Sequence, residues 1–318
     1  MTAPRAVSAA GRSLLLLRPP LRVARAHHHP QQRAFATSLT RRSDTPDPRG
    51  VTQYTLNADG SVQHRQIGTR LDVPLSKEQA GDEPHLTAAG VDAYLTSKLA
   101  HPDYASDPAL LRGLARADEA GLPKIAVTPQ LGQFLAVLTK AVKAERVLEI
   151  GTLGGYSTAF FAKALPRTGQ IDTIEYSPQH AKVAQANFLD LDLFPFPTVH
   201  VGPALDILRD PAGPFAAPPG EIDPGYDVVF VDADKEAYFD YFVEALRLTK
   251  SGGVIVFDNA IRGGRIAVPD GAEVPSDATG LRKIFDWIQA DAGKTVLSAA
   301  IQTVGDKNWD GFAIVYKN

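Results

Sequence analysis

The sequence contains no cysteine among its 318 residues. This absence excludes disulfide bonds, thiolate-ligated zinc or iron–sulfur sites, and any catalytic thiol. It also contains no apolar run long enough for a membrane span, because a spanning helix needs about 20 consecutive apolar residues. The hydrophobic (44%) and charged (22%) shares are ordinary for a globular protein, so we expect one large domain with extensions.

Acidic residues are absent from the first 43 positions, which contain eight arginines and no lysine. An arginine-rich, serine-containing segment without acids is typical of a mitochondrial transit peptide. The stretch RAFATS at 33–38 is similar to a mitochondrial processing site. Residues 1–43 are therefore predicted to direct the chain to the mitochondrial matrix, and a cytoplasmic location is expected if this segment is not processed. A disordered basic N-terminus without a targeting role is the alternative.

The rest of the chain is acidic, with 25 basic residues against 36 acidic ones. Nucleic-acid binding needs a basic surface, so this net charge of about −11 argues against a nucleic-acid partner. Residues 44–86 are polar and contain several prolines, and we expect an arm over the main domain or a dimer contact. Asp59-Gly60 within this arm favours a small hairpin between 54–56 and Val62.

Helical patterns begin at residue 87 and occur three times before the first expected strand. Thr87 and Thr128 are suitable N-caps, and Pro129 fits the first helical position. In the third segment apolar residues recur at i, i+3, i+4, i+7 and i+11, which is one face of a helix. The predicted helices are 87–99, 107–120 and 128–142.

From Arg146 onward, short apolar runs alternate with helical patterns. This alternation predicts a doubly wound, mostly parallel α/β sheet with helices on both faces. A short Asp/Gly/Asn-rich link joins the last two strands, so we expect an antiparallel pair at one edge. The Gly/Pro-rich segments 209–225 and 260–278 are predicted loops. The predicted strands are 147–150, 170–175, 198–201, 228–231, 254–257, 295–301 and 312–316, with helices between them that include 177–191 and 281–290.

Two neighbouring apolar strands end in oxygen-bearing side chains. Asp232 ends one strand, and Asp258 and Asn259 end the next. Parallel strands bring their carboxyl ends to one edge of the sheet, which is where open α/β sheets bind ligands. Three such side chains converging there suit a hard cation such as Mg²⁺. Lys235, shortly after Asp232, is a candidate base beside that cation.

Each of these residues also has an ordinary structural explanation when it is taken alone. Lys235 would be a surface lysine that opens a helix. The pair Asp258-Asn259 would be a turn after a buried strand. The joint spacing of these residues with Asp232 is what favours a functional site over both explanations.

A glycine-rich turn, Gly151-Thr-Leu-Gly-Gly155, lies where the first predicted strand meets a helix. Glycines allow the backbone to approach a ligand, and the helix N-terminus can receive it. The dinucleotide fingerprint G-x-G-x-x-G is absent because residue 153 is leucine, and there is no P-loop. Glu175 ends the second strand, where a carboxylate can accept hydrogen bonds from both ribose hydroxyls of an adenosine. This combination favours S-adenosylmethionine over a dinucleotide, with an ordinary strand–helix turn as the alternative.

Six pieces of sequence together resemble the cation-dependent O-methyltransferases, the group of caffeoyl-CoA and catechol O-methyltransferases. Their order and spacing match that family throughout. They are GQFL (132–135), EIGTLGGYS (149–157), IEYSP (174–178), VFVDADKEAY (229–238), GGVIVFDN (252–259) and DGFAIVYK (310–317). The resemblance implies a Rossmann-like sheet of seven strands with a reversed last strand, within one methyltransferase domain (87–318), and a homodimer.

The resemblance implies a role for each matching residue on the metal side of the site. Asp232, Asp258 and Asn259 match the three protein ligands of a divalent cation such as Mg²⁺, and Lys235 matches the catalytic base. Two adjacent hydroxyls of a small aromatic diol would complete the coordination. The metal would lower the pKa of one hydroxyl, and Lys235, held near Asp232, would take its proton.

The same resemblance implies a site for S-adenosylmethionine. Most of the matching residues would line the methionine part and the sulfonium end, whereas Glu175 matches the ribose-binding acid. The expected cofactor residues are Glu149, Gly151, Thr152, Tyr156, Ser157, Glu175 and Asp232.

The chain departs from the family where the acceptor would bind. Ile261-Arg262 stands where the family has an aromatic residue, and 209–225 is a proline-rich insertion. An aromatic vicinal diol is therefore expected as a class, without a specific compound. Two other functions stay open at this point. One is a metal-independent small-molecule methyltransferase, and the other is a catalytically silent adenosyl-binding subunit of a mitochondrial assembly.

Overall fold

The structure is a computed structural model that describes the chain in several segments. The described residues are 52–56, 62–66, 87–216, 225–269, 272–305 and 309–318. The predicted transit peptide and most of the predicted arm lie outside them. The chain divides into two compact units, Met1–Thr69 and Arg70–Asn318.

The first unit contains the predicted hairpin. Strand β1 (Thr52–Leu56) pairs antiparallel with β2 (Val62–Gln66), and Leu56 lies opposite Val62. The hairpin between these two short strands is therefore confirmed, while its Asp59-Gly60 turn lies outside the described residues.

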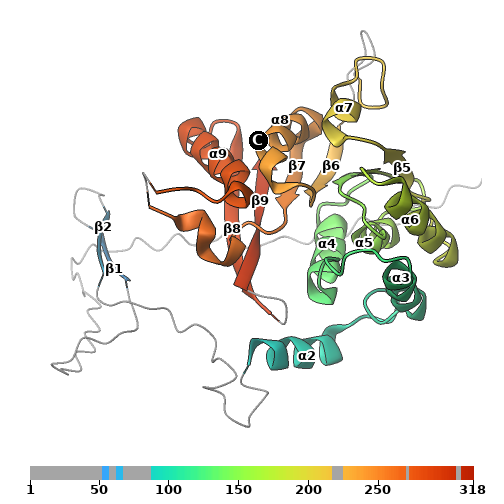
Figure 1. The fold of residues 1–318 in the computed structure, drawn as a ribbon. Helices are drawn as coiled ribbons and strands as arrows, with labels where there is room; N and C mark the ends of the chain where they lie inside the picture. Colours follow the sequence, from blue (N-terminus) through green and yellow to red (C-terminus); the bar gives the residue numbers. More distant parts are fainter. Residues whose placement is uncertain (1–51, 57–61, 67–86, 217–224, 270–271, 306–308) are drawn as a thin grey trace, which may run out of the picture. The chain divides into compact units, whose positions relative to one another are not determined.

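A seven-stranded sheet forms the centre of the second unit (Figure 1). Its strands are β3 (Arg146–Ile150), β4 (Gln170–Glu175), β5 (Thr198–Val201), β6 (Tyr226–Val231), β7 (Thr249–Phe257), β8 (Val296–Val304) and β9 (Trp309–Lys317). Their order is β5-β4-β3-β6-β7-β9-β8, and β9 runs in the direction opposite to the other six strands. The predicted reversed last strand is confirmed, and it lies one place inside the edge strand β8.

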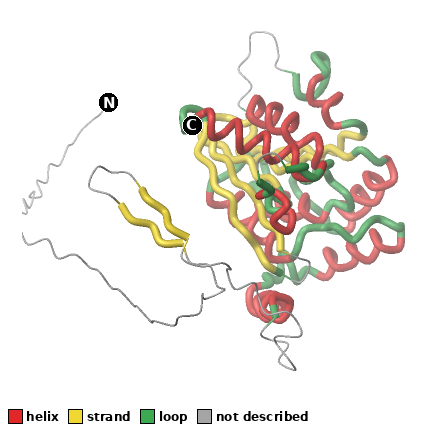
Figure 2. The backbone as a smooth tube through the Cα atoms, turned by 60° about the vertical axis from the view of Figure 1, so that its left-hand side comes forward, coloured by secondary structure: helices red, strands yellow, loops and turns green. Residues whose placement is uncertain are grey.

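Helices cover both faces of this sheet (Figures 1 and 2). They are α2 (Ala88–Leu99), α3 (Pro108–Glu119), α4 (Pro129–Ala141), α5 (Tyr156–Ala164), α6 (Pro178–Asp190), α7 (Ala204–Arg209), α8 (Tyr238–Leu248) and α9 (Ser276–Asp291), with short 3₁₀ helices η2 (Lys235–Ala237) and η3 (Arg262–Ala267). Core residues of α4 and α5 belong to one cluster, and those of α8 and α9 belong to another. Within the described part, no helix is long and apolar enough to span a membrane.

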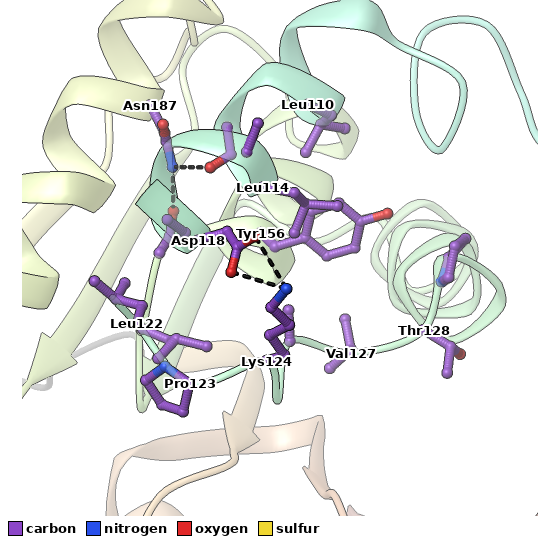
Figure 3. A pocket seen from close by; sticks show the side chains of 18 of the residues that line it. Leu110, Leu114, Asp118, Leu122, Pro123, Lys124, Val127, Thr128, Tyr156 and Asn187 are labelled. Carbon is purple, nitrogen blue, oxygen red and sulfur yellow. Dashed lines mark hydrogen bonds and ion pairs between the residues drawn. The ribbon is translucent and has the colours of Figure 1, made fainter. Parts of the chain in front are cut away.

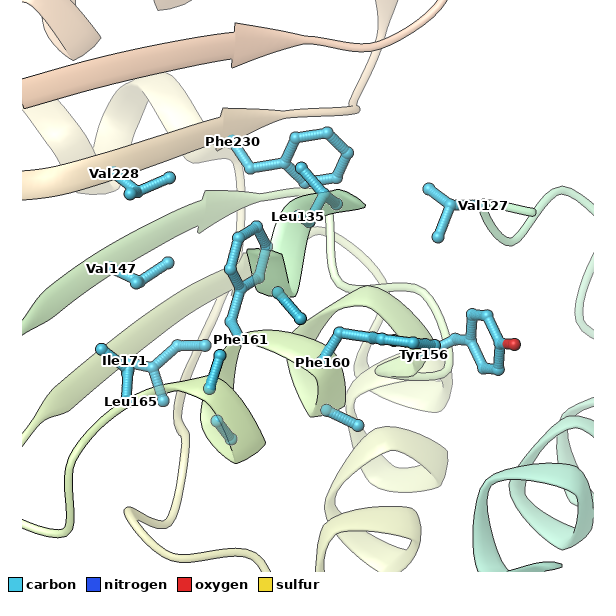
Figure 4. Close-up of a cluster of buried hydrophobic side chains, with 14 of the residues drawn as sticks. Val127, Leu135, Val147, Tyr156, Phe160, Phe161, Leu165, Ile171, Val228 and Phe230 are labelled. Carbon is cyan, nitrogen blue, oxygen red and sulfur yellow. The ribbon is translucent and has the colours of Figure 1, made fainter. Parts of the chain in front are cut away.

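Successive side chains of the central strands point to opposite faces of the sheet and so contribute to both hydrophobic cores. In β6, Val228 and Phe230 belong to the cluster of α4 and α5, whereas Val229 and Val231 belong to that of α8 and α9. Figure 4 shows the first cluster, in which Phe161 of α5 packs toward the sheet with its ring 5.8 Å from that of Phe230. A strand that is buried on both faces needs apolar residues at every position, which explains its uninterrupted apolar sequence.

Four helices begin at side-chain caps. Thr87, Asp107, Thr128 and Ser177 each accept a hydrogen bond from a backbone N–H of the first turn. Proline follows the last three caps at the start of the helix, where its missing N–H costs nothing. The predicted starts of these four helices are therefore confirmed.

The prediction was wrong where glycine and proline are frequent. The expected loop 260–278 contains η3 and the first turn of α9, and α7 was not predicted just before the other expected loop. A Cβ on Gly280 of α9 would lie 2.5 Å from the carbonyl oxygen of Lys235. Gly280 therefore lies inside a helix because only a residue without a side chain fits this close contact. In a sequence, glycine usually indicates a break in a helix.

Candidate active site

A cleft of about 1120 Å³ opens where the parallel strands end. Its walls come from the turn after β3, the ends of β4, β6 and β7, and the start of α4. Every residue predicted for the site lines it except Glu149. Those that line it are Gly151, Thr152, Tyr156, Ser157, Glu175, Asp232, Lys235, Asp258 and Asn259. The structure therefore brings the expected cofactor and metal residues into one cavity.

Gly151 sets the spacing between the glycine-rich turn and the end of β6. Its φ is +103°, and a Cβ built on it would lie 2.2 Å from the carbonyl oxygen of Asp232. A side chain does not fit in that gap, so glycine is what allows the two strand ends to meet. The turn consequently lies directly beside the residue expected to border both cofactor and metal.

Glu175 ties the glycine-rich turn to the start of α6. Its Oε2 accepts the backbone N–H of Thr152 (3.2 Å) and that of Leu153 (2.8 Å). Its Oε1 accepts the N–H of Ser177 (2.9 Å), and His180 Nδ1 lies 3.2 Å from the same oxygen. Because these contacts fix the carboxylate at the cleft wall, Glu175 offers a preorganised acceptor for hydroxyl groups.

Glu149 lies beneath the cleft and does not line it. The residue is fully buried (0% exposed) and accepts hydrogen bonds from the hydroxyls of Ser157 (2.5 Å), Thr158 and Thr173 (2.7 Å). Burial raises the pKa of Glu149 to about 7, although the three hydrogen bonds act in the opposite direction. In this structure Glu149 therefore holds Ser157, which does line the cleft. Thr158 and Thr173, which sequence analysis missed, complete this buried group.

Replacing Glu149 with glutamine is expected to change how stability depends on pH. Below pH 4.5 the carboxyl is protonated in both the folded and the unfolded chain. Between pH 4.5 and about 7 only the folded chain keeps the proton, so the free energy of unfolding falls as pH rises, by about 3 kcal/mol in total. Urea unfolding across this range should show a smaller fall for Glu149→Gln. The same fall in both proteins would contradict a raised pKa at this residue.

Two carboxylates and an amide meet on the side of the cleft where a metal is expected. Asp258 accepts the N–H of Asn259 (2.7 Å), and burial together with the negative charge of Asp232 raises the pKa of Asp258 to about 7. Neighbouring carboxylates repel each other unless a cation compensates them, and carboxylate and amide oxygens form a hard donor set. The residues therefore fit a divalent cation. No group of three or more acidic or histidine side chains that could hold a metal occurs among the described residues. The set in the cleft has two acidic side chains, Asp232 and Asp258, and its third member is an asparagine.

Lys235 begins η2 and points back to the end of β6. Its Nζ donates to Asp232 Oδ1 (2.6 Å) and to the hydroxyl of Tyr238 (2.7 Å). The Tyr238 hydroxyl lies 3.2 Å from the carbonyl oxygen of Asp258, to which it donates. Burial raises the pKa of Tyr238 well above its usual value, so its proton stays in place. Sequence analysis gave Tyr238 no role, and the i, i+3 spacing from Lys235 was the available signal.

A second cavity of about 440 Å³ adjoins the cleft behind the glycine-rich turn. Its mainly apolar lining comes from α3, α6 and the segment before α4, and Tyr156 is shared with the cleft. Figure 3 shows Lys124 in this cavity, paired with Asp118 at 2.9 Å. The described residues around the second cavity include none of the three expected metal ligands, all of which line the larger cleft.

Arg262 lines the cleft at the end where the acceptor is expected and where the sequence lacks the family's aromatic residue. Its guanidinium contacts Asp277 at 2.5 Å and lies 3.9 Å from Asp310. These carboxylates hold the arginine at the rim. The rim is therefore built from ion pairs at this point.

Solved structures share this fold and contain SAM or SAH. An O-methyltransferase from Bacillus cereus in complex with SAH is 34% identical, with a TM-score of 0.65 and coverage of 73% of this chain and 98% of that one. The O-methyltransferase TomG from Streptomyces achromogenes in complex with SAM is 35% identical, with a TM-score of 0.64 and coverage of 73% and 97%. The fold is that of the Rossmann-like methyltransferases.

Sequence comparison narrows this class to a family. A family model described as O-methyltransferase matches residues 103–306. A catechol O-methyltransferase of Mycobacterium tuberculosis is 46% identical over 226 residues, covering 70% of this chain and 93% of that protein. Another from Niastella koreensis is 39% identical over 228 residues, covering 70% and 95%. The chain belongs to the O-methyltransferase family.

Proposed function

We propose that the protein transfers the methyl group of S-adenosylmethionine to one hydroxyl of a small catechol-like acceptor, with a divalent cation such as Mg²⁺. One observation carries this proposal. A single cleft contains the glycine-rich turn held by Glu175 and, beside it, the group Asp232, Lys235, Asp258 and Asn259. Family membership supports transfer to oxygen, and the catechol O-methyltransferases among the relatives support a vicinal diol.

The cofactor half of the cleft would bind the adenosyl and methionine parts separately. Glu175 is fixed by backbone N–H groups and offers its remaining acceptor capacity to ribose hydroxyls. Tyr156 and Ser157 open α5 and line the cleft, where the N-terminus of the helix favours a carboxylate group. The two ends of the cofactor would thus be oriented by groups that hydrogen bonds already hold in place, and such alignment is the main contribution of binding to methyl transfer.

The metal half would hold the acceptor. Asp232, Asp258 and Asn259 would hold the cation through three side-chain oxygens, a donor set that suits Mg²⁺. When bound, the cation would supply charge that lowers the pKa of an acceptor hydroxyl. Lys235, held by Asp232 and by the Tyr238 hydroxyl, takes the proton. The acceptor oxygen then attacks the methyl carbon in line with the departing sulfur.

Methyl transfer from labelled S-adenosylmethionine to a set of catechols is the direct test. We expect transfer with Mg²⁺ and none after EDTA treatment, and we expect Asp258→Ala to lower kcat/KM by about 10²-fold or more because one of three metal ligands is lost. Transfer that survives both EDTA and Asp258→Ala would contradict the metal centre and leave a metal-independent methyltransferase. Absence of any transfer, together with capture of a stoichiometric partner protein, would support the silent adenosyl-binding subunit.

The proposal includes a location and an assembly that rest on sequence alone. The arginine-rich segment 1–43 is proposed to direct the chain to the mitochondrial matrix, and the catalytic unit is proposed to form a homodimer. Residues 1–43 lie outside the described residues.

A further inference from the structure

Asn259 is held in an uncommon backbone conformation at the end of β7. Its φ is +54°, in the left-handed region that asparagine tolerates better than most side chains. The next residue, Ala260, donates its N–H to the carbonyl oxygen of Gly311 in β9 (2.8 Å). The segment that follows the expected metal ligands is therefore attached to the reversed strand and does not stand alone.

Asp310, at the start of β9, makes most of the side-chain contacts to this segment. Its Oδ1 accepts the backbone N–H of Ile261 (3.1 Å) and that of Arg262 (2.8 Å). Its Oδ2 accepts the side-chain N–H of Asn259 (Nδ2, 3.4 Å). Its side chain is 25% exposed, so these contacts lie partly out of water. One carboxylate thus contacts both the backbone of the loop and the amide of the candidate ligand.

We propose that Asp310 is a positioning residue that orients the Asn259 amide for the cation. This inference rests on the metal centre of the proposed function. An asparagine binds a hard cation through its oxygen, and Nδ2 cannot bind it. With Nδ2 directed to Asp310, Oδ1 is the amide atom that remains for the cleft. Groups that hydrogen-bond to metal ligands in this way commonly account for 10–100-fold in metal affinity.

The Asp310→Asn variant tests orientation separately from loop attachment. The introduced amide can still accept the N–H groups of Ile261 and Arg262 through its oxygen, but its NH₂ group would face the Nδ2 of Asn259. Two donors in contact would turn the Asn259 amide around or push it away. We expect the affinity of the full chain for Mn²⁺ to fall by about 10–100-fold. The electron spin resonance signal of free Mn²⁺ in a titration measures this affinity. The thermal midpoint should change by only a few degrees.

A reciprocal exchange provides the rescue. In the double variant Asn259→Asp with Asp310→Asn, the hydrogen bond between the two side chains is restored in the opposite direction, because the amide of residue 310 now donates to a carboxylate oxygen of residue 259. The other carboxylate oxygen of residue 259 faces the cleft. The total charge of the pair equals that of the original protein. We expect this double variant to recover most of the Mn²⁺ affinity lost by Asp310→Asn, because aspartate also tolerates a positive φ.

Asp277→Asn is the matched control. It removes the same charge from the ion-pair partner of Arg262 without touching Asn259, and it should change Mn²⁺ affinity by less than about fivefold. Mn²⁺ binding to Asp310→Asn within twofold of the original protein would overturn the inference while leaving the metal centre intact. Failure of the double variant to recover affinity, including the case in which Asp310→Asn is unfolded, would overturn it as well. Absence of Mn²⁺ binding by the original protein would overturn the metal centre first and this inference with it.

Discussion

A Lys235→Met variant is expected to lose about 10²–10⁴-fold in kcat, which is the usual contribution of a general base. The physical reason is local. Lys235 Nζ contacts Asp232 Oδ1 and the Tyr238 hydroxyl on the metal side, and methionine keeps the apolar stem but removes the proton acceptor. Among its described contacts, Lys235 reaches the expected cofactor residues through Asp232 alone, so affinity for S-adenosylhomocysteine should change by no more than about twofold. Single-turnover rates and calorimetric titration measure the two quantities separately.

Lys124→Met is the matched control for this variant. Lys124 lines the same cleft, but its side chain is 77% exposed and is paired with Asp118. Its loss should change kcat by about twofold at most. A similar loss of rate in both variants would show that the positive charge of the cleft matters and that proton transfer by Lys235 does not. A Lys235→Met enzyme with nearly full kcat would remove the base from the proposed mechanism.

A Gly151→Ala variant is expected to lose about 3–5 kcal/mol in the free energy of unfolding, from an unfavourable positive φ and from severe overlap. The added Cβ would lie 2.2 Å from the carbonyl oxygen of Asp232, in a place where only backbone can yield. The turn would have to move away from β6, so the cofactor should also bind more weakly. Guanidinium unfolding and titration with S-adenosylhomocysteine measure the two losses.

Gly121→Ala separates the two causes. Gly121 also has a positive φ (+75°), but a Cβ built on it has no atom within 4 Å. Its alanine variant should therefore cost only the backbone part, about 1–2 kcal/mol, and leave cofactor affinity unchanged. Equal losses in the two variants would mean that contact with Asp232 is not what requires glycine at position 151.

The arrangement of the sheet was predictable because local signals and burial agree. Buried parallel strands need apolar residues at every position, and the alternation of such runs with capped helices specifies the doubly wound sheet. Starts at Thr128 and Ser177 follow from the chemistry of a single cap. The start of α9 did not follow, because Gly280 serves the packing against Lys235 and that contact depends on tertiary structure.

The residues of the site could be predicted to a similar extent. Asp232 and Asp258 end neighbouring parallel strands, so sequence alone could bring them to one cleft. The direction of each side chain could not be predicted in the same way. Glu149 turns beneath the cleft to three hydroxyl groups, and Asp310 reaches Asn259 from a strand 51 residues later. Contacts between distant segments leave no periodic pattern in the sequence, so both required the folded chain.

The insertion of β9 between β7 and β8 has a consequence for the order in which the protein can be made. Among the described strands β9 comes after all the others in the chain, yet it pairs with both of its neighbours, and β8 is joined to the sheet through β9 alone. A nascent chain that has completed every earlier element still lacks the strand that carries Asp310 and holds the edge. Without β9, β8 would have no partner among the described strands and β7 would keep only β6, so the facing edges of β7 and β8 would be open to pairing with other chains.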